Sequence, residues 1–369
     1  MPGSKPPFRA DQVGSLLRPQ ALKEARARRA SGEIGAAALP AVEDDEIRKV
    51  IAKQEAIGLK AVTDGEFRRA FWHLDFLERI GGVESYEGEQ QPMFKGVQHK
   101  PVMLRTVGKV VPAIDHPMID HFRFVKDNAN VVAKMTIPSP TSLHFRYGRA
   151  SIDAGVYPDL DAFFADLGQA YAAMVQAFYD AGCRYLQLDE VNMAYLCDPE
   201  QRDGVRERGA DPETLPATYA MLMEAAIGGR PDDMSVTTHL CRGNFRSTFV
   251  ASGGYEPVAE ILLNGISFDG YFMEYDTDRA GGFEPLRFTP KGKTIVLGLV
   301  TSKTGEMESK DAIKARIEEA SKFVPLDQLA LSPQCGFSST EEGNVITEDD
   351  QWRKLEVVVE VAKEVWGGL

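Results

Sequence analysis

Residues 234–243 read Met-Ser-Val-Thr-Thr-His-Leu-Cys-Arg-Gly and predict a buried strand that ends in reactive side chains. The β-branched run favours an extended strand, in which successive side chains point to opposite faces. His239 and Cys241 are two residues apart, so they lie on the same face. An imidazole and a thiolate on one face can bind a soft divalent metal such as zinc. A core histidine beside a buried cysteine would give the same pattern.

Similar strand-like runs recur along the chain, separated by stretches of helical period. The expected strands are Ala10–Gly14, Lys60–Thr63, Val131–Ile137, Tyr185–Asp189, Ser235–Leu240, Gly270–Tyr275, Thr294–Val300 and Leu329–Ser332. The expected helices are Asp44–Ala56, Leu160–Ala181, Leu215–Ile227, Glu256–Leu263, Lys310–Phe323 and Asp349–Val365. Strands that alternate with helices in this way predict an α/β fold, a single TIM (β/α)8 barrel over residues 1–369. No G-x-G-x-x-G turn follows an early strand, which argues against a dinucleotide-binding sheet.

One segment departs from this alternation of strands and helices. Residues 81–124 are rich in Gln, Gly, Lys and His, and we expect a hairpin-like insertion after the second strand.

Four cysteines are too few for a disulfide framework, and the N-terminus has no charged-then-apolar leader, so we expect a cytoplasmic protein. A net charge of −13 and the lack of a membrane-length apolar segment argue against nucleic acid and membranes as partners. A homo-oligomer is compatible with this composition.

Polar side chains follow most of the expected strands, where TIM-barrel active sites lie. In strand order they are Ser15, Glu66, Ser139 and Thr141, Asp189 and Glu190, His239 and Cys241, Glu274, Ser302 and Lys303, and Cys335. Among them, a histidine, two cysteines and a glutamate could together bind one Zn²⁺. Two thiolates and a carboxylate make zinc a poor activator of water but suit it to holding a substrate thiolate, so we expect a thiol substrate. A closed, structural zinc site is the alternative.

Several of these segments resemble the catalytic C-terminal barrel of cobalamin-independent methionine synthase, in the same order along the chain. They are Val13-Gly-Ser15, Asp64-Gly-Glu66, Leu186-Gln-Leu-Asp189-Glu190, Thr238-His-Leu-Cys241, Met273-Glu274 and Pro333-Gln-Cys335-Gly. The resemblance implies that His239, Cys241, Glu274 and Cys335 bind zinc. It also implies that Ser15, Glu66 and Asp189 bind homocysteine. Carboxylates at Glu66 and Asp189 suit the substrate ammonium, and Ser15 suits its carboxylate.

The chain also departs from the full-length synthases. It lacks their N-terminal barrel, so it resembles the short, core-type members. The full-length synthases carry an Asp-x-His-Ser motif after strand seven, and its histidine is proposed to protonate the folate. This chain has Thr301-Ser-Lys303-Thr at that place. Lysine is a weaker general acid at neutral pH. We therefore expect poor turnover of 5-methyltetrahydrofolate and better turnover of a donor whose leaving group needs no protonation, such as a methylcorrinoid. The sequence leaves the donor open between a folate, a corrinoid carried by a partner protein and a small methylated metabolite.

The run that follows Glu66 has two interpretations. Arg68, Arg69, Trp72 and His73 either cap a helix and pack in the core, or line a pocket for an anionic or flat substrate.

Taken together, these features predict a zinc-dependent S-methyltransferase that converts homocysteine to methionine, with Asp189 and Lys303 as catalytic residues. One alternative is an enzyme like the epoxyalkane:coenzyme M transferases. The thiol substrate of such an enzyme carries a sulfonate, which would need cations such as Arg68 and Arg69 to bind it. Glu66 and Asp189 instead favour an amino-acid thiol. The other alternative is a zinc hydrolase or a decarboxylase-like barrel.

Overall fold

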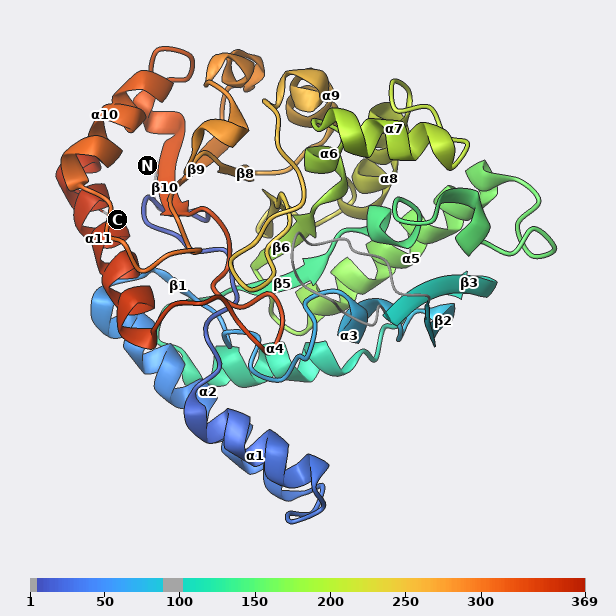
Figure 1. Ribbon diagram of the computed structural model, residues 1–369, viewed down its shortest axis with the longest axis horizontal. Coiled ribbons are helices and arrows are strands. Elements are labelled where there is room, and N and C mark those ends of the chain that lie inside the picture. Colours follow the sequence, from blue (N-terminus) through green and yellow to red (C-terminus); the bar gives the residue numbers. More distant parts are fainter. Residues whose placement is uncertain (1–4, 89–101, 369) are drawn as a thin grey trace.

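The centre of the molecule is a parallel sheet whose strands follow one another in chain order (Figure 1). A computed structural model describes residues 5–88 and 102–368. Six strands pair in the order β10-β9-β8-β7-β6-β5, and β1 pairs with β4 in a separate parallel ladder. The strands of these two sheets are β1 Ala61–Val62, β4 Val132–Ala133, β5 Met135–Pro138, β6 Tyr185–Glu190, β7 Ser235–Leu240, β8 Gly270–Glu274, β9 Thr294–Val300 and β10 Leu329–Pro333.

The first expected strand, Ala10–Gly14, is not a regular strand. Only Ala10 forms a bridge, a parallel one to Leu331, in which Asp11 N–H donates to Leu331 O and Leu331 N–H donates to Arg9 O. On the other side, the contact to the β1 region runs through a side chain, because Thr63 Oγ1 donates to Gly14 O at 2.6 Å. The segment thus lies between β10 and β1, as TIM-barrel order requires. Strand pairing within the described ranges does not by itself close the sheet into a barrel.

Helices surround the sheet and cover its outer face (Figure 1). They are α1 Gln20–Ala30, α2 Ala38–Ile57, α3 Leu74–Leu77, α4 Pro117–Asn128, α5 Leu160–Asp180, α6 Asn192–Tyr195, α7 Pro199–Glu207, α8 Leu215–Ile227, α9 Glu256–Gly265, α10 Lys310–Ala320 and α11 Glu348–Trp366. Short 3-10 turns are Pro140–Leu143, Gly148–Ser151, Asp278–Ala280, Glu284–Phe288 and Leu326–Gln328. No helix in the described ranges is long and apolar enough to cross a membrane.

The expected helices are present, and their apolar faces explain their positions. Every residue of β6, β7, β8 and β10 is buried, so helices must cover the strands on the outside. Helix α5, for example, buries Phe163, Leu167, Tyr171 and Phe178. Its first turn is capped by Asp159, whose side chain accepts a hydrogen bond from the N–H of residue 161.

The segment expected as an insertion contains an antiparallel pair, β2 Gly81–Glu87 and β3 Val102–Val111. Residues 89–101 of that segment lie outside the described residues. Its last part, residues 117–124, belongs to helix α4, which buries Met118, Ile119, Phe122 and Val125. The hairpin therefore ends at about Val111, and α4 is one of the helices that cover the sheet.

Candidate metal centre and substrate cavity

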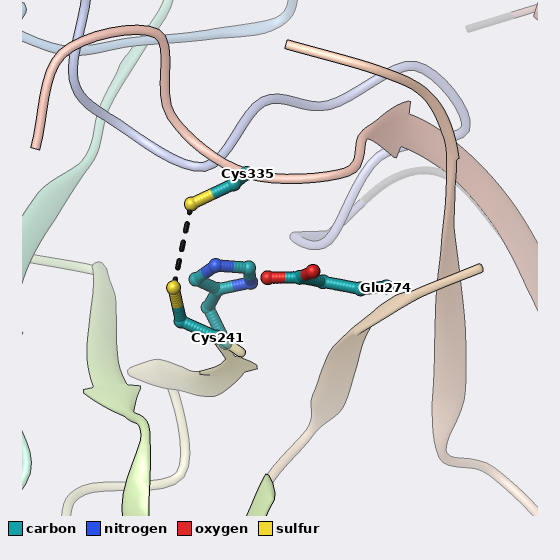
Figure 2. A group of neighbouring side chains, drawn as sticks. Cys241, Glu274 and Cys335 are labelled. Atoms are coloured by element: carbon teal, nitrogen blue, oxygen red, sulfur yellow. Dashed lines mark hydrogen bonds between the residues drawn. The ribbon is translucent and has the colours of Figure 1, made fainter. Parts of the chain in front are cut away.

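Four potential metal ligands meet at the carboxyl ends of three strands. His239 is the fifth residue of β7 and Cys241 follows that strand, Glu274 ends β8, and Cys335 follows β10. One ligand atom from each of the four lies within 4.8 Å of the others, and all four side chains are buried. The two sulfur atoms are 3.5 Å apart, and the carboxylate of Glu274 approaches from another direction (Figure 2).

The environment of these side chains fits a bound metal ion. Neither ring nitrogen of His239 makes a hydrogen bond of normal geometry in the part of the chain that the structure describes, although the ring is buried. Such a nitrogen is costly to bury unless it binds something. Two hydrogen bonds orient the carboxylate of Glu274. Its Oε1 accepts from Arg242 N–H at 2.9 Å, and its Oε2 accepts from Arg279 Nη2 at 2.9 Å. One imidazole, two thiols and one carboxylate form a donor set that zinc prefers.

Electrostatics around the four ligands favour a thiolate at Cys335 and a carboxylate at Glu274. The hydrogen bond from Cys241 lowers the pKa of Cys335 well below its ordinary value, and the same contact raises the pKa of Cys241. Burial works against ionisation of Glu274, but the charges of Lys303, Arg279 and His239 bring its pKa below the ordinary value. The cluster is therefore a buried anionic site stabilised by nearby cations.

A cavity of about 110 Å³ opens beside this cluster. The residues predicted from the sequence that line it are Ser15, Glu66, Trp72, His73, Asp189, His239, Cys241 and Cys335. Glu274 does not line the cavity, which places it on the far side of the cluster. The structure therefore brings both the predicted ligands and most of the predicted substrate-binding residues to one site.

Two carboxylates form an acidic wall of the cavity. Glu66 Oε1 accepts from Thr136 Oγ1 at 3.0 Å and lies 3.5 Å from a guanidinium nitrogen of Arg69. Glu66 Oε2 is buried and has no hydrogen-bond partner among the described residues. Asp189 Oδ1 accepts from Gln187 Nε2 at 2.7 Å, and burial raises the pKa of Asp189 to about 7. This wall has spare acceptor capacity for a cationic group.

Ser15 holds the loop that carries Cys335. Its hydroxyl accepts from Ser338 N–H at 3.3 Å, and its carbonyl accepts from Phe337 N–H at 2.9 Å. Gly336 is required here, because a Cβ atom at this position would lie 2.0 Å from Ser15 Oγ. The Gly-Ser turn of the sequence thus fixes the position of a metal ligand as well as lining the cavity.

Arg68, Arg69 and Lys303 are not among the residues that line the cavity. Arg68 pairs with Glu43 and Asp44 of α2. Arg69 Nη2 donates to Thr136 O at 2.6 Å.

Lys303 is held by the cavity wall. Its Nζ donates to Asn244 Oδ1 and to Thr248 O, both at 3.0 Å. All three cations are thus bound by protein groups. The partners of the two arginines are carboxylates of α2 and a carbonyl of β5, not the start of a helix.

Other lining residues did not stand out in the sequence. They include Phe71, Arg146, Tyr195, Asn244, Phe245 and Thr340. Two loops that contribute them are joined, since Trp72 N–H donates to Ser339 O at 3.0 Å and Phe71 forms an antiparallel bridge with Thr340. Arg146 and Tyr195 come several residues after β5 and β6, beyond the strand ends that the sequence pattern highlighted. Only the aromatic run after Glu66 gave a signal.

The fold is of the α/β type, and the ends of its parallel strands bring together a thiol-rich group of candidate metal ligands. The chain matches the family described as the catalytic domain of cobalamin-independent synthase over residues 8–364. It belongs to that family, as the resemblance in its sequence predicted, and the family's members are methyltransferases.

Three relatives illustrate this membership. The uncharacterised protein YxjH of Bacillus subtilis (strain 168) is 50% identical over 98% of this chain and 96% of its own. A candidate vitamin-B12 independent methionine synthase from Listeria monocytogenes has a solved structure that is 44% identical, with a TM-score of 0.81 over 99% of both chains. The 5-methyltetrahydropteroyltriglutamate–homocysteine methyltransferase of Bacillus licheniformis is 24% identical over 88% of this chain but only 38% of its own length. This chain therefore corresponds to less than half of that methyltransferase.

Proposed function

We propose that the protein is a zinc-dependent methyltransferase that transfers a methyl group to the thiol of homocysteine and forms methionine. The observation that carries this proposal is one cavity with a thiol-rich metal cluster on one wall and an acidic pair, Glu66 and Asp189, on another. Homocysteine offers a thiol to the first wall and an ammonium group to the second. Membership of the cobalamin-independent synthase family supports the same reaction.

The metal would be held by His239, Cys241, Glu274 and Cys335. Zinc bound there would supply a Lewis acid that lowers the pKa of the substrate thiol, so that a thiolate is present at neutral pH. With both cysteines and the carboxylate ionised, the ligands would carry more negative charge than the ion neutralises. Such a donor set does not favour activation of water, which argues against the hydrolase alternative.

The chain's own residues would orient the amino acid. Glu66 Oε2 has no hydrogen-bond partner among the described residues, so it can accept a hydrogen bond from the substrate ammonium without giving up another bond. Asp189 lies on the same cavity. Anchoring the ammonium fixes the direction of the side chain, and the thiol is then presented to the metal wall.

The decisive experiment is a screen of methyl donors with homocysteine and the zinc-loaded protein. Candidate donors are 5-methyltetrahydrofolate, methylcobalamin and small methylated onium compounds. Formation of methionine with one of them is the expected result. The coenzyme M-type alternative is tested in the same screen with 2-mercaptoethanesulfonate as the thiol. Alkylation of that sulfonate thiol, with homocysteine inert, would refute the proposal.

A further inference from the structure

The cavity lining also includes side chains that differ in chemistry from the acidic pair. They are aromatic residues and one cation, namely Phe71, Trp72, Tyr195, Phe245 and Arg146. Homocysteine, bound through its ammonium at Glu66 and Asp189, would leave these side chains to the second substrate. Their chemistry therefore bears on the identity of the methyl donor.

Arg146 lines the cavity, has no acidic partner among the described residues and hydrogen-bonds the side chain of Tyr147. No carboxylate lies within 4.0 Å of it in the described ranges, whereas Arg68 pairs with Glu43 and Asp44. His73, on the same cavity, does not add charge at neutral pH, because burial and the nearby Arg146 lower its pKa to about 3. An arginine that lines a cavity without an acid partner suits a carboxylate of the ligand, which it can bind through two parallel hydrogen bonds.

Tyr195 lies near both Arg146 and the candidate metal ligands, because the charges of Cys241, Glu274 and Cys335 and that of Arg146 all act on its hydroxyl. Burial raises the pKa of Tyr195, so it stays a neutral aromatic residue. With Trp72 and Phe245 it supplies ring surface to the same cavity. Aromatic surfaces of this kind attract methylated onium cations.

We propose that the donor is a small zwitterion, a methylated sulfonium or quaternary ammonium group joined by a short chain to a carboxylate. Arg146 binds the carboxylate, and the aromatic residues contact the onium group. This inference rests on the proposed homocysteine methylation and names the donor class for the same site.

The chemistry of such a donor agrees with the position of Lys303. The homocysteine thiol loses its proton to solvent, its sulfur forms a new bond to the methyl carbon, and the bond from that carbon to the onium atom breaks. The electron pair of the broken bond goes to the onium atom, which leaves as a neutral thioether or amine. No acid has to protonate it, so a lysine held by Asn244 and Thr248 is no obstacle.

Binding measurements separate the two halves of this proposal. Calorimetry without homocysteine would compare 3-(methylthio)propanoate, the product acid, with its amide. The acid should bind roughly 10- to 100-fold more tightly. (2-Carboxyethyl)dimethylsulfonium should bind roughly 2- to 30-fold more tightly than 4-methylpentanoate, an isostere that keeps the carboxylate and lacks the onium charge. Equal binding of acid and amide would overturn the role of Arg146, and equal binding of sulfonium and isostere would overturn the onium donor.

Three variants make the test specific. Arg146→Gln should abolish the preference for the acid over the amide, and Arg146→Lys should restore part of it. Arg123→Gln is a matched control, because Arg123 is an exposed arginine of α4 that pairs with Asp120. It should keep the preference. A preference retained in Arg146→Gln would overturn the proposal.

Turnover distinguishes this inference from the proposed function. Methionine formed from (2-carboxyethyl)dimethylsulfonium, with KM raised by Arg146→Gln, would support both. Methionine formed from 5-methyltetrahydrofolate or methylcobalamin but not from the sulfonium acid would overturn the donor class and leave homocysteine methylation standing. Failure of homocysteine to bind or react with every donor would overturn the proposed function itself.

Discussion

The sulfur atoms of Cys241 and Cys335 lie 3.5 Å apart, although the two residues are separated by 94 positions in the chain. They follow strands β7 and β10, which are not neighbours in the sheet, so the contact forms across its carboxyl end. A buried pair of thiols beside an imidazole and a carboxylate makes a site for a soft metal.

Cys335→Ser should remove most of the bound metal. A serine hydroxyl is a much poorer zinc ligand than a thiolate, and the remaining three groups would hold the ion weakly. Purified protein should contain close to one zinc per chain by elemental analysis, and the variant should contain little. Cys183→Ala, at a buried cysteine outside the cluster, is the control and should keep its zinc. Full zinc content in Cys335→Ser would contradict the site.

Asp189→Asn and Glu66→Gln should weaken binding of homocysteine but hardly affect 1-butanethiol. Each substitution removes a charged acceptor for the substrate ammonium, and a charged hydrogen bond contributes about 1.5–3 kcal/mol. The affinity for homocysteine should fall roughly 10- to 100-fold. Calorimetric titration of both thiols into the zinc-loaded protein measures the difference. Equal losses for the two thiols would show that the carboxylates do not bind the ammonium.

Lys303→Met should disturb the wall and the metal cluster without removing an acid from the reaction. The side chain is anchored to Asn244 and Thr248, and its charge stabilises the carboxylate of Glu274. We expect weaker zinc retention against a chelator and an unchanged shape of the pH–kcat profile. The loss of one limb of that profile would instead identify Lys303 as the general acid of the original expectation.

His144→Gln should make folding stability less dependent on pH. Burial, followed by the charge of Arg208, lowers the pKa of His144 to about 4, whereas an unfolded histidine titrates near 6.5. Between these values the unfolded chain binds the extra proton, so the native state loses stability as pH falls from about 6.5 to 4. From pH 7 to pH 5 the native protein should lose about 2 kcal/mol more than the variant. Urea titrations at the two pH values measure this, and identical losses would contradict it.

Much of the site could be predicted from the sequence because strand ends converge in this class of fold. Alternation placed His239 and Cys241 on one face, and the carboxyl ends of parallel strands meet at one end of the sheet. Glu274 and Cys335 therefore joined them as expected.

The strand pattern was less informative about Ala10–Gly14. That segment has the expected composition but pairs through one bridge. The Thr63 hydroxyl occupies Gly14 O, and the Gln54 side chain occupies the N–H and the carbonyl of Thr63, which are groups that a ladder would use. Composition indicates which residues favour a strand. It does not indicate where side chains will compete for the backbone.

The sequence by itself determined most of the succession of strands and helices, the four side chains of the candidate metal centre and the two carboxylates of the cavity, because each depends on local period or on position at a strand end. Only the tertiary structure decided which cations reach the cavity. Arg68 and Arg69 follow Glu66 closely, yet α2 and the backbone of β5 bind them. No sequence pattern pointed to Arg146, yet this residue lines the cavity. Long side chains can turn toward any partner within reach, so their final contacts depend on the neighbours that folding brings together.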